Sequence, residues 1–201
     1  MTTAISAKEV AALRSATGAG MMDCKKALVE AGGDSQKAQE LLRQKGLKSA
    51  DKKADRSTSE GAVFSYIHHN QRVGVMVQIA CETDFVARGE DFVSLCSDLC
   101  MHIAATVPAP VAISASEVPQ ELIAEERRIL LGSEDMANKP DEIKEKIVDG
   151  RIDKFVKERA LLEQEYVKDP AMTVDDRLKA CIAKVGENMK VENFARFELG
   201  S

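Results

Sequence analysis

The fold is decided by residues 61–79, GAVFSYIHHNQRVGVMVQI, in which apolar and polar side chains alternate on both sides of a short polar break. Residues 63–67 and 73–79 show the two-residue period of β-strands, and residues 69–72 between them are turn formers. This pattern predicts an antiparallel hairpin.

A third strand is expected near the end of the chain, at residues 188–199 (NMKVENFARFEL). Its apolar series shifts by one residue between Val191 and Phe194, which predicts a β-bulge. The hairpin and this late strand can pair as a three-stranded antiparallel sheet. Because helical spacing fills most of the remaining chain, the expected fold class is α+β.

Residues 1–46 are expected to form a compact module of three helices. Ser6 and Glu9 have the spacing of a capping box, in which each residue satisfies the other's backbone amide. The expected helices start after Ser6, at Met21 and after Asp34, and they end at Gly18, Glu30 and Gly46. Residues 47–60 (LKSADKKADRSTSE) are highly charged, so we interpret them as a linker or a solvated helix. Residues 61–201 then form the α+β core and dimerisation domain.

Further helices are expected to cover the sheet. Phe92, Cys96, Leu99 and Ile103 have helical spacing. Later helices are expected at residues 119–131, 140–149 and 151–163, separated by Gly132, Pro140 and Gly150. Thr173 is expected to cap a last helix that ends at Gly186.

The composition excludes several classes of protein. The 201 residues are 44% hydrophobic and 30% charged, which is typical of a globular protein. A net charge of −5 gives no reason to expect a nucleic-acid or membrane surface, although residues 1–56 carry +4 and residues 57–201 carry −9. The chain has no signal-peptide or membrane-span pattern, and its five cysteines include no C-x-x-C pair. We expect a cytoplasmic protein with reduced thiols.

The sequence offers no pattern for catalysis, metal binding or a cofactor. Gly18 and Gly20 follow no strand and lack the third glycine of a dinucleotide loop, so they predict a turn between helices. His68 and His69 are adjacent, and on a strand they would point to opposite faces. Cys96 and Cys100 are better explained as core residues than as ligands. We therefore predict that the chain is not an enzyme.

Residues 81–90 (CETDFVARGE) allow two interpretations. Thr83 or Asp84 is expected to cap the helix that follows the hairpin. Phe85 then either staples that helix to the core or projects outward as an anchor for a partner. Met21 and Met22 raise the same question, because adjacent residues on a helix cannot both face a small core.

Two segments of the chain resemble the signature segments of a known family. They are TGAGMMDCKKAL at residues 17–28 and TDFVA at residues 83–87. Shorter similarities follow at residues 66–69 (YIHH), 72–75 (RVGV) and 196–200 (RFELG). On these residues the chain resembles the elongation factor Ts family over essentially its whole length, in the short form that has one sheet module where longer members have two.

The resemblance implies a guanine-nucleotide exchange factor for elongation factor Tu, the GTPase that delivers aminoacyl-tRNA to the ribosome. It implies that the three-helix module, similar to a ubiquitin-associated (UBA) domain, docks on the GTPase, and that residues 83–86 enter beside its magnesium and nucleotide site. The implied contacts are Arg14, Met21, Met22 and Lys25 for docking, Asp84 and Phe85 as the wedge, and Thr83 and Val86 as the residues that shape it. His68 and His69 fall where longer members have a contact histidine, although the turn lengths differ.

The single sheet module further implies a two-fold homodimer, paired through the sheet, that binds two GTPases. Two alternatives remain. A binding adaptor could use residues 1–46 as a UBA-type module for another protein, which would leave Thr83 to Ala87 without a role. An enzyme would have to use Cys81 or Cys96.

Overall fold

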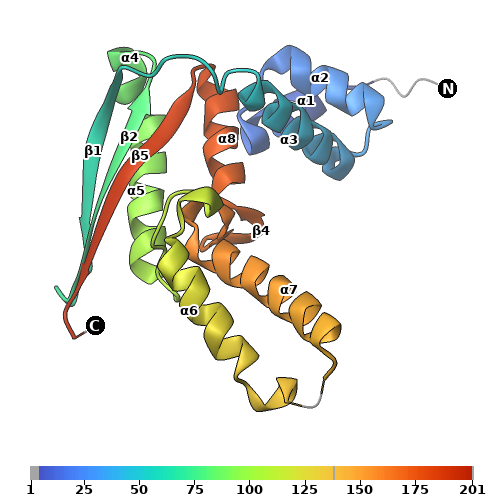
Figure 1. Cartoon of the computed structure of the whole chain (residues 1–201). Helices are drawn as coiled ribbons and strands as arrows, with labels where there is room; N and C mark the ends of the chain where they lie inside the picture. Colours follow the sequence, from blue (N-terminus) through green and yellow to red (C-terminus); the bar gives the residue numbers. More distant parts are fainter. Residues whose placement is uncertain (1–4, 138, 201) are drawn as a thin grey trace.

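The fold is built around a three-stranded antiparallel sheet (Figure 1). The computed structural model describes residues 5–137 and 139–200. The strands β1 (Glu60–Ile67), β2 (Val73–Cys81) and β5 (Met189–Glu198) pair in the order β1-β2-β5, which confirms the predicted sheet. The predicted bulge is also confirmed, because Gln78 pairs with Asn193 while Ile79 pairs with Val191, which leaves Glu192 as the extra residue.

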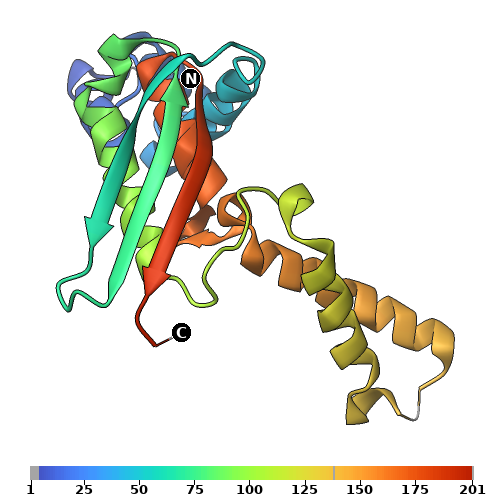
Figure 2. The ribbon, with the colours of Figure 1, turned by 60° about the vertical axis from the view of Figure 1, so that its left-hand side comes forward.

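Two helices cover one face of the sheet. Helix α5 (Glu90–Ala105) and helix α8 (Val174–Val185) pack on the inward side chains, and in Figure 2 they lie behind the three strands. As predicted, Thr173 caps α8, and Gly186, with φ +86°, ends it. The core between sheet and helices is mostly aliphatic, and Phe92 is its fully buried aromatic, edge-on to Phe64.

The N-terminal region forms three helices with a small apolar core of their own. They are α1 (Ala7–Thr17), α2 (Met21–Glu30) and α3 (Ser35–Asp51). The Ser6–Glu9 capping box is present, and Asp34 caps α3 by accepting hydrogen bonds from two backbone amides. The buried residues of this cluster are Val10, Leu13, Cys24, Ala27, Leu28 and Ala38.

Helix α3 does not end near Gly46, and residues 47–51 belong to the helix rather than to a linker. Gly46 lies against α8, where a Cβ added to it would be 3.4 Å from Cβ of Ala183. One turn later Ala50 is buried in the main core. Packing of α3 on α8 therefore outweighs the roughly 1 kcal/mol by which glycine disfavours a helix.

A helical hairpin projects from the sheet and its covering helices (Figure 2). It consists of α6 (Gln120–Leu131) and α7 (Asp141–Arg159). The predicted break at Gly150 is wrong, because α7 runs through it. Val148 and Ile152, on either side of Gly150, belong with Met136 to one buried apolar cluster, and burial on both sides of the glycine favours a continuous helix. The segment that follows α7 is a 3-10 turn (Leu161–Glu163) and not the rest of a helix.

Two short strands, β3 (Glu165–Tyr166) and β4 (Asp169–Thr173), were not predicted. They lie beside the buried His102, whose Nδ1 accepts a hydrogen bond from the Val167 amide at 3.3 Å and whose Nε2 is 2.9 Å from Oε1 of Gln164. Burial lowers the pKa of His102 and keeps its ring neutral, although the bond to Gln164 opposes the shift.

A half-buried ion cluster joins α5 to the β3–β4 hairpin and α8. Asp98 accepts hydrogen bonds from Lys168 at 2.7 Å and from Arg177 at 3.0 Å. Burial alone would raise the pKa of Asp98, but the hydrogen bonds from these two cations outweigh it and lower the pKa.

All five cysteines are buried and unpaired. Burial raises the pKa of Cys96 to about 12 and that of Cys100 to about 11, so both remain protonated thiols. Their packing in the core of α5 confirms the interpretation of Cys96 and Cys100 as core residues. Within the described parts of the chain, no helix combines the length and apolar character needed to cross a bilayer.

Candidate partner-binding site

The segment after β2 forms a single helical turn, α4 (Asp84–Ala87). Thr83 caps it, since its Oγ1 accepts a hydrogen bond from the Val86 amide at 3.4 Å. Val86 is buried under the turn and belongs to the main core, whereas Phe85 is 83% exposed. The interpretation of Phe85 as a core staple is therefore wrong, and its ring projects outward.

The start of α4 is held by contacts from two other segments. The backbone amide of Thr83 donates to Oε2 of Glu187 at 3.1 Å, and its hydroxyl donates to Oε1 at 2.9 Å. The Thr83 carbonyl accepts a hydrogen bond from the Cys81 thiol at 3.1 Å. Burial, with a smaller effect of Glu187, raises the pKa of Cys81 and keeps it a donor. These contacts fix the backbone two residues before Phe85.

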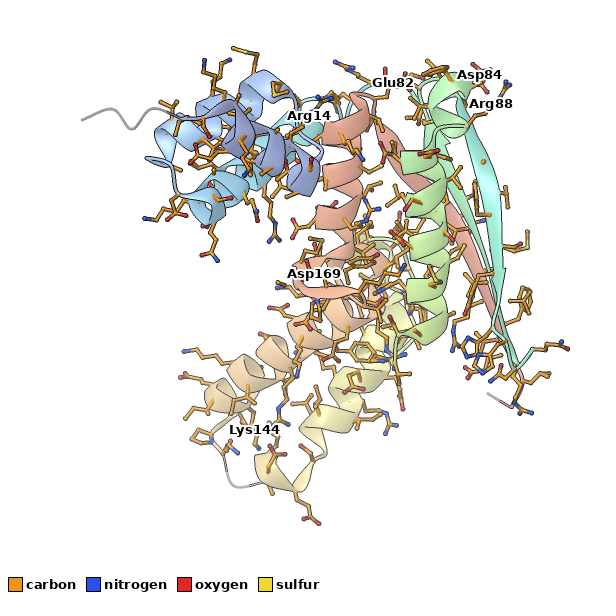
Figure 3. The ribbon with its side chains drawn as sticks, turned by 180° about the vertical axis from the view of Figure 1, so that it is seen from behind. Arg14, Glu82, Asp84, Arg88, Lys144 and Asp169 are labelled. Carbon is orange, nitrogen blue, oxygen red and sulfur yellow. The ribbon has the colours of Figure 1, made fainter. Side chains whose placement is uncertain are left out.

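Charged residues flank Phe85 in the sequence of this segment. Asp84 and Arg88, one turn apart on the same side, form an ion pair at 3.0 Å, and both side chains are largely exposed. Figure 3 shows them with Glu82 at one end of the molecule. An exposed aromatic side chain flanked by charged residues has the character of a binding anchor.

The predicted docking residues of the N-terminal helices also lie on the surface. Met21 is 47% exposed and Met22 is 62% exposed, so neither is a core residue. Arg14 on α1 and Lys25 on α2 are exposed as well. The three-helix region and α4 lie at the same end of the molecule, on either side of the end of α8 (Figures 1 and 3).

His68 and His69 lie at the opposite end of the sheet, in the turn between β1 and β2. His69 lies in the turn, as predicted, and His68 directly follows the last residue of β1, so the two rings do not alternate across a strand. Their rings are 4.2 Å apart, because the chain leaves β1 at Ile67 before reaching them. Nδ1 of His68 is 2.9 Å from the hydroxyl of Tyr66. Among the described residues, no group of three or more His, Cys, Asp or Glu side chains could hold a metal ion.

Comparison with known proteins identifies the family. The family model described as "Elongation factor TS" matches residues 35–201. The chain belongs to the elongation factor Ts family. The "Elongation factor Ts" of Synechocystis is 53% identical over 196 residues, which cover 98% of this chain and 89% of that protein. The chloroplastic elongation factor Ts of Rhodomonas salina is 52% identical over 200 residues, which cover 100% of this chain and 91% of the relative.

Two residues next to α4 in this elongation factor Ts family member were missed by the sequence analysis. Glu187 holds Thr83, and Asn188 holds the segment that leaves α3, because its Nδ2 donates to the carbonyls of Ala54 at 3.2 Å and Arg56 at 2.8 Å. One signal could have found them. Antiparallel pairing of β2 with β5 places the residues just before β5 opposite those just after β2.

Proposed function

We propose that this member of the elongation factor Ts family is a guanine-nucleotide exchange factor for elongation factor Tu that acts by binding, without covalent or acid/base chemistry. The observation that carries the proposal is Phe85, 83% exposed at the tip of a one-turn helix whose backbone is held in place. An aromatic side chain left in water on a preformed turn gains free energy when a partner buries it.

The proposed mechanism couples burial of Phe85 to loss of nucleotide. Asp84 and Phe85 act as a wedge beside the magnesium and nucleotide site of the GTPase, with Thr83 and Val86 shaping the turn. Burial of a phenylalanine side chain contributes roughly 2–3 kcal/mol. If the wedge enters only when the magnesium shell is disrupted, the same free energy weakens nucleotide binding, because coupling between two ligands is reciprocal. At 1.4 kcal/mol for each factor of ten, this corresponds to about 30- to 140-fold.

The N-terminal helices are proposed as the docking module, with Arg14, Met21, Met22 and Lys25 on the contact surface. Exposed methionines make adaptable contacts, and basic residues favour an acidic partner surface. We assign this role to helices α1 to α3, with α3 extending to Asp51 beyond the expected boundary at residue 46, and the α+β core to residues 61–201. The Arg43–Asp176 and Asp51–Lys179 ion pairs, at 2.9 and 2.8 Å, hold α3 on α8, so the module keeps a defined position relative to Phe85.

The test is release of a fluorescent guanine nucleotide from elongation factor Tu, with and without this protein. Acceleration that saturates with protein concentration supports the proposal, and an unchanged release rate refutes it. The assay belongs at neutral pH in a reducing buffer, since five unpaired buried cysteines suit a reducing compartment such as the cytoplasm.

A homodimer is proposed through the outer face of the sheet. This face carries exposed apolar side chains from all three strands and the segment after β5: Val63 and Ile67 from β1, Met76 from β2, Phe197 from β5 and Leu199 just beyond it. No helix covers it in Figure 2. Two such faces can pack as a sandwich. His68 and His69 lie at the opposite end of the sheet from α4. We therefore propose that, in the dimer, these histidines of one protomer contact the GTPase that is bound by Phe85 of the other protomer.

The dimer is tested by sedimentation. The wild-type protein should have twice the 21.9 kDa mass of the chain. Met76→Lys should produce a monomer, because it places a charge at the centre of the face, whereas Ile129→Lys on the projecting α6 should leave the dimer intact. A wild-type monomer at all concentrations would refute the proposal.

A further inference from the structure

The β2–β5 ladder is continued by two side chains beyond its last backbone pair. That pair is Cys81 with Met189. Past it, the carboxylate of Glu187 accepts the amide of Thr83 at 3.1 Å, and the carboxylate of Glu82 accepts the amide of Asn188 at 2.6 Å. Each chain thus supplies an acidic side chain that bonds to the backbone of the other, in place of the carbonyl that an extended ladder would offer.

Glu187 also orients the hydroxyl group that caps α4. A carboxylate can only accept hydrogen bonds, and the single hydroxyl proton of Thr83 is directed to it at 2.9 Å. The lone pairs of Oγ1 are thereby left for the Val86 amide, which donates to them at 3.4 Å. The carbonyl of Thr83 accepts from the Cys81 thiol and from the Ala87 amide. The amide, the hydroxyl and the carbonyl of Thr83 are therefore all engaged in hydrogen bonds.

The loop that carries Glu187 also contacts the chain leaving the N-terminal helices. The Asn188 side chain is buried and bonds to the carbonyls of Ala54 and Arg56. Arg56 in turn lies 3.4 Å from Oε1 of Glu82, the residue before Thr83. Two adjacent residues of one loop, Glu187 and Asn188, therefore connect α4 with the segment that leaves the N-terminal helices.

We propose that Glu187 is a positioning residue for nucleotide exchange, an inference that rests on the proposed function and deepens it. Glu187 acts through Thr83: it holds the N-cap residue of α4 so that Asp84 and Phe85 are presented in one orientation. Without it, the turn remains attached through Val86, but the Thr83 hydroxyl and amide lose their acceptor. Phe85 then samples several orientations, and the conformational entropy that it loses on binding the partner weakens the interaction.

A purely structural role for Glu187 makes different predictions. Its hydrogen bonds to this segment go to Thr83, the N-cap of α4, while Val86 and Cys81 are buried in the main core. A stabilising contact of this kind would affect melting and leave the action of Phe85 unchanged. A positioning contact would affect nucleotide exchange only while Phe85 is present.

The experiment is a double-mutant cycle between Glu187 and Phe85, read by nucleotide release from elongation factor Tu. We expect Glu187→Ala to lower kcat/KM for release about tenfold or more, since it removes two charge-assisted hydrogen bonds. Glu187→Gln keeps one acceptor oxygen and should retain an intermediate activity. In the Phe85→Ala background, Glu187→Ala should cause no further loss. Glu145→Ala, at an exposed position on α7, is the matched control and should behave as wild type.

A second readout does not depend on the GTPase. Amide hydrogen exchange at Thr83 and Val86 should become about tenfold faster in Glu187→Gln and remain unchanged in Glu145→Ala. The positioning role is overturned if Glu187→Ala accelerates nucleotide release as well as the wild-type protein does. It is equally overturned if the double variant loses activity by the product of the two single-variant factors, because the two residues then act independently. It is also overturned if the two amides keep their protection. A wild-type protein that fails to accelerate release refutes the proposed function itself, and the amide measurement then still decides whether Glu187 holds the turn.

Discussion

Replacing Phe85 with alanine should separate the stability of the fold from the action on the GTPase. Because the side chain is 83% exposed, the folded chain buries little of it, and the free energy of unfolding should change by less than about 0.5 kcal/mol. For a chain of this size the melting temperature should shift by no more than about 2 °C. The lost burial in the partner is worth roughly 2–3 kcal/mol, so acceleration of nucleotide release should fall about 30- to 140-fold.

The assay is stopped-flow release of a fluorescent guanine nucleotide, paired with thermal melting of the same samples. Phe92→Ala is the contrasting variant, because Phe92 is fully buried and its loss should lower the melting temperature by about 6–20 °C. Ile129→Ala, which removes a 53% exposed apolar side chain from α6, should change neither measurement. The reasoning fails if Phe85→Ala retains full exchange activity, or if it melts as early as Phe92→Ala.

Three further predictions concern the docking surface, the buried histidine and the start of β1. Met22→Glu should raise the concentration for half-maximal exchange about tenfold without changing the melting temperature, because Met22 is 62% exposed; an unchanged concentration would remove it from the docking surface. Burial lowers the pKa of His102 below its usual 6.5, so the unfolded chain binds more protons than the folded chain as the pH falls through 6.5. The melting temperature should therefore be lower at pH 5.5 than at pH 7.5. His102→Gln should reduce this difference in melting temperature. Gly61→Ala should lower the free energy of unfolding by about 2 kcal/mol or more in urea titrations, because φ is +146° and the added Cβ would lie 2.2 Å from the Ile79 carbonyl oxygen; a wild-type midpoint would contradict this.

The sheet could be predicted because its signals are local. Alternation in residues 61–79 specifies two strands and their inward faces, and the one-residue shift between Val191 and Phe194 corresponds to the bulge at Glu192. Helix ends marked only by glycine were less reliable. Gly18 ends α1 with φ +69°, but Gly46 and Gly150 lie inside helices whose neighbouring residues pack on other elements. A glycine disfavours a helix by about 1 kcal/mol, and a few buried side chains outweigh that.

The candidate site could be predicted only in part, because some of its features depend on packing between segments that are distant in the sequence. The cap at Thr83 is a local signal, but whether Phe85 or Val86 faces the core depends on where the sheet lies relative to the turn. Glu187 is 104 residues away from Thr83 in sequence, and only the pairing of β2 with β5 brings the two together. The β3–β4 hairpin is short and polar, so periodicity could not reveal it.

The buried cysteines can report local unfolding, because their thiols react with a reagent only when the surrounding core opens. With a pKa of about 12 for Cys96 and about 11 for Cys100, the thiolate fractions at pH 7 are on the order of 10⁻⁵ and 10⁻⁴. A thiol reagent therefore reacts with them mainly when α5 separates from the sheet. Cys24 is buried in the separate cluster of the three N-terminal helices. Labelling followed by peptide mapping would measure the opening rate of each core separately. A partner that stabilises one core would lower the labelling rate of the cysteines in that core and leave the rate of the others unchanged.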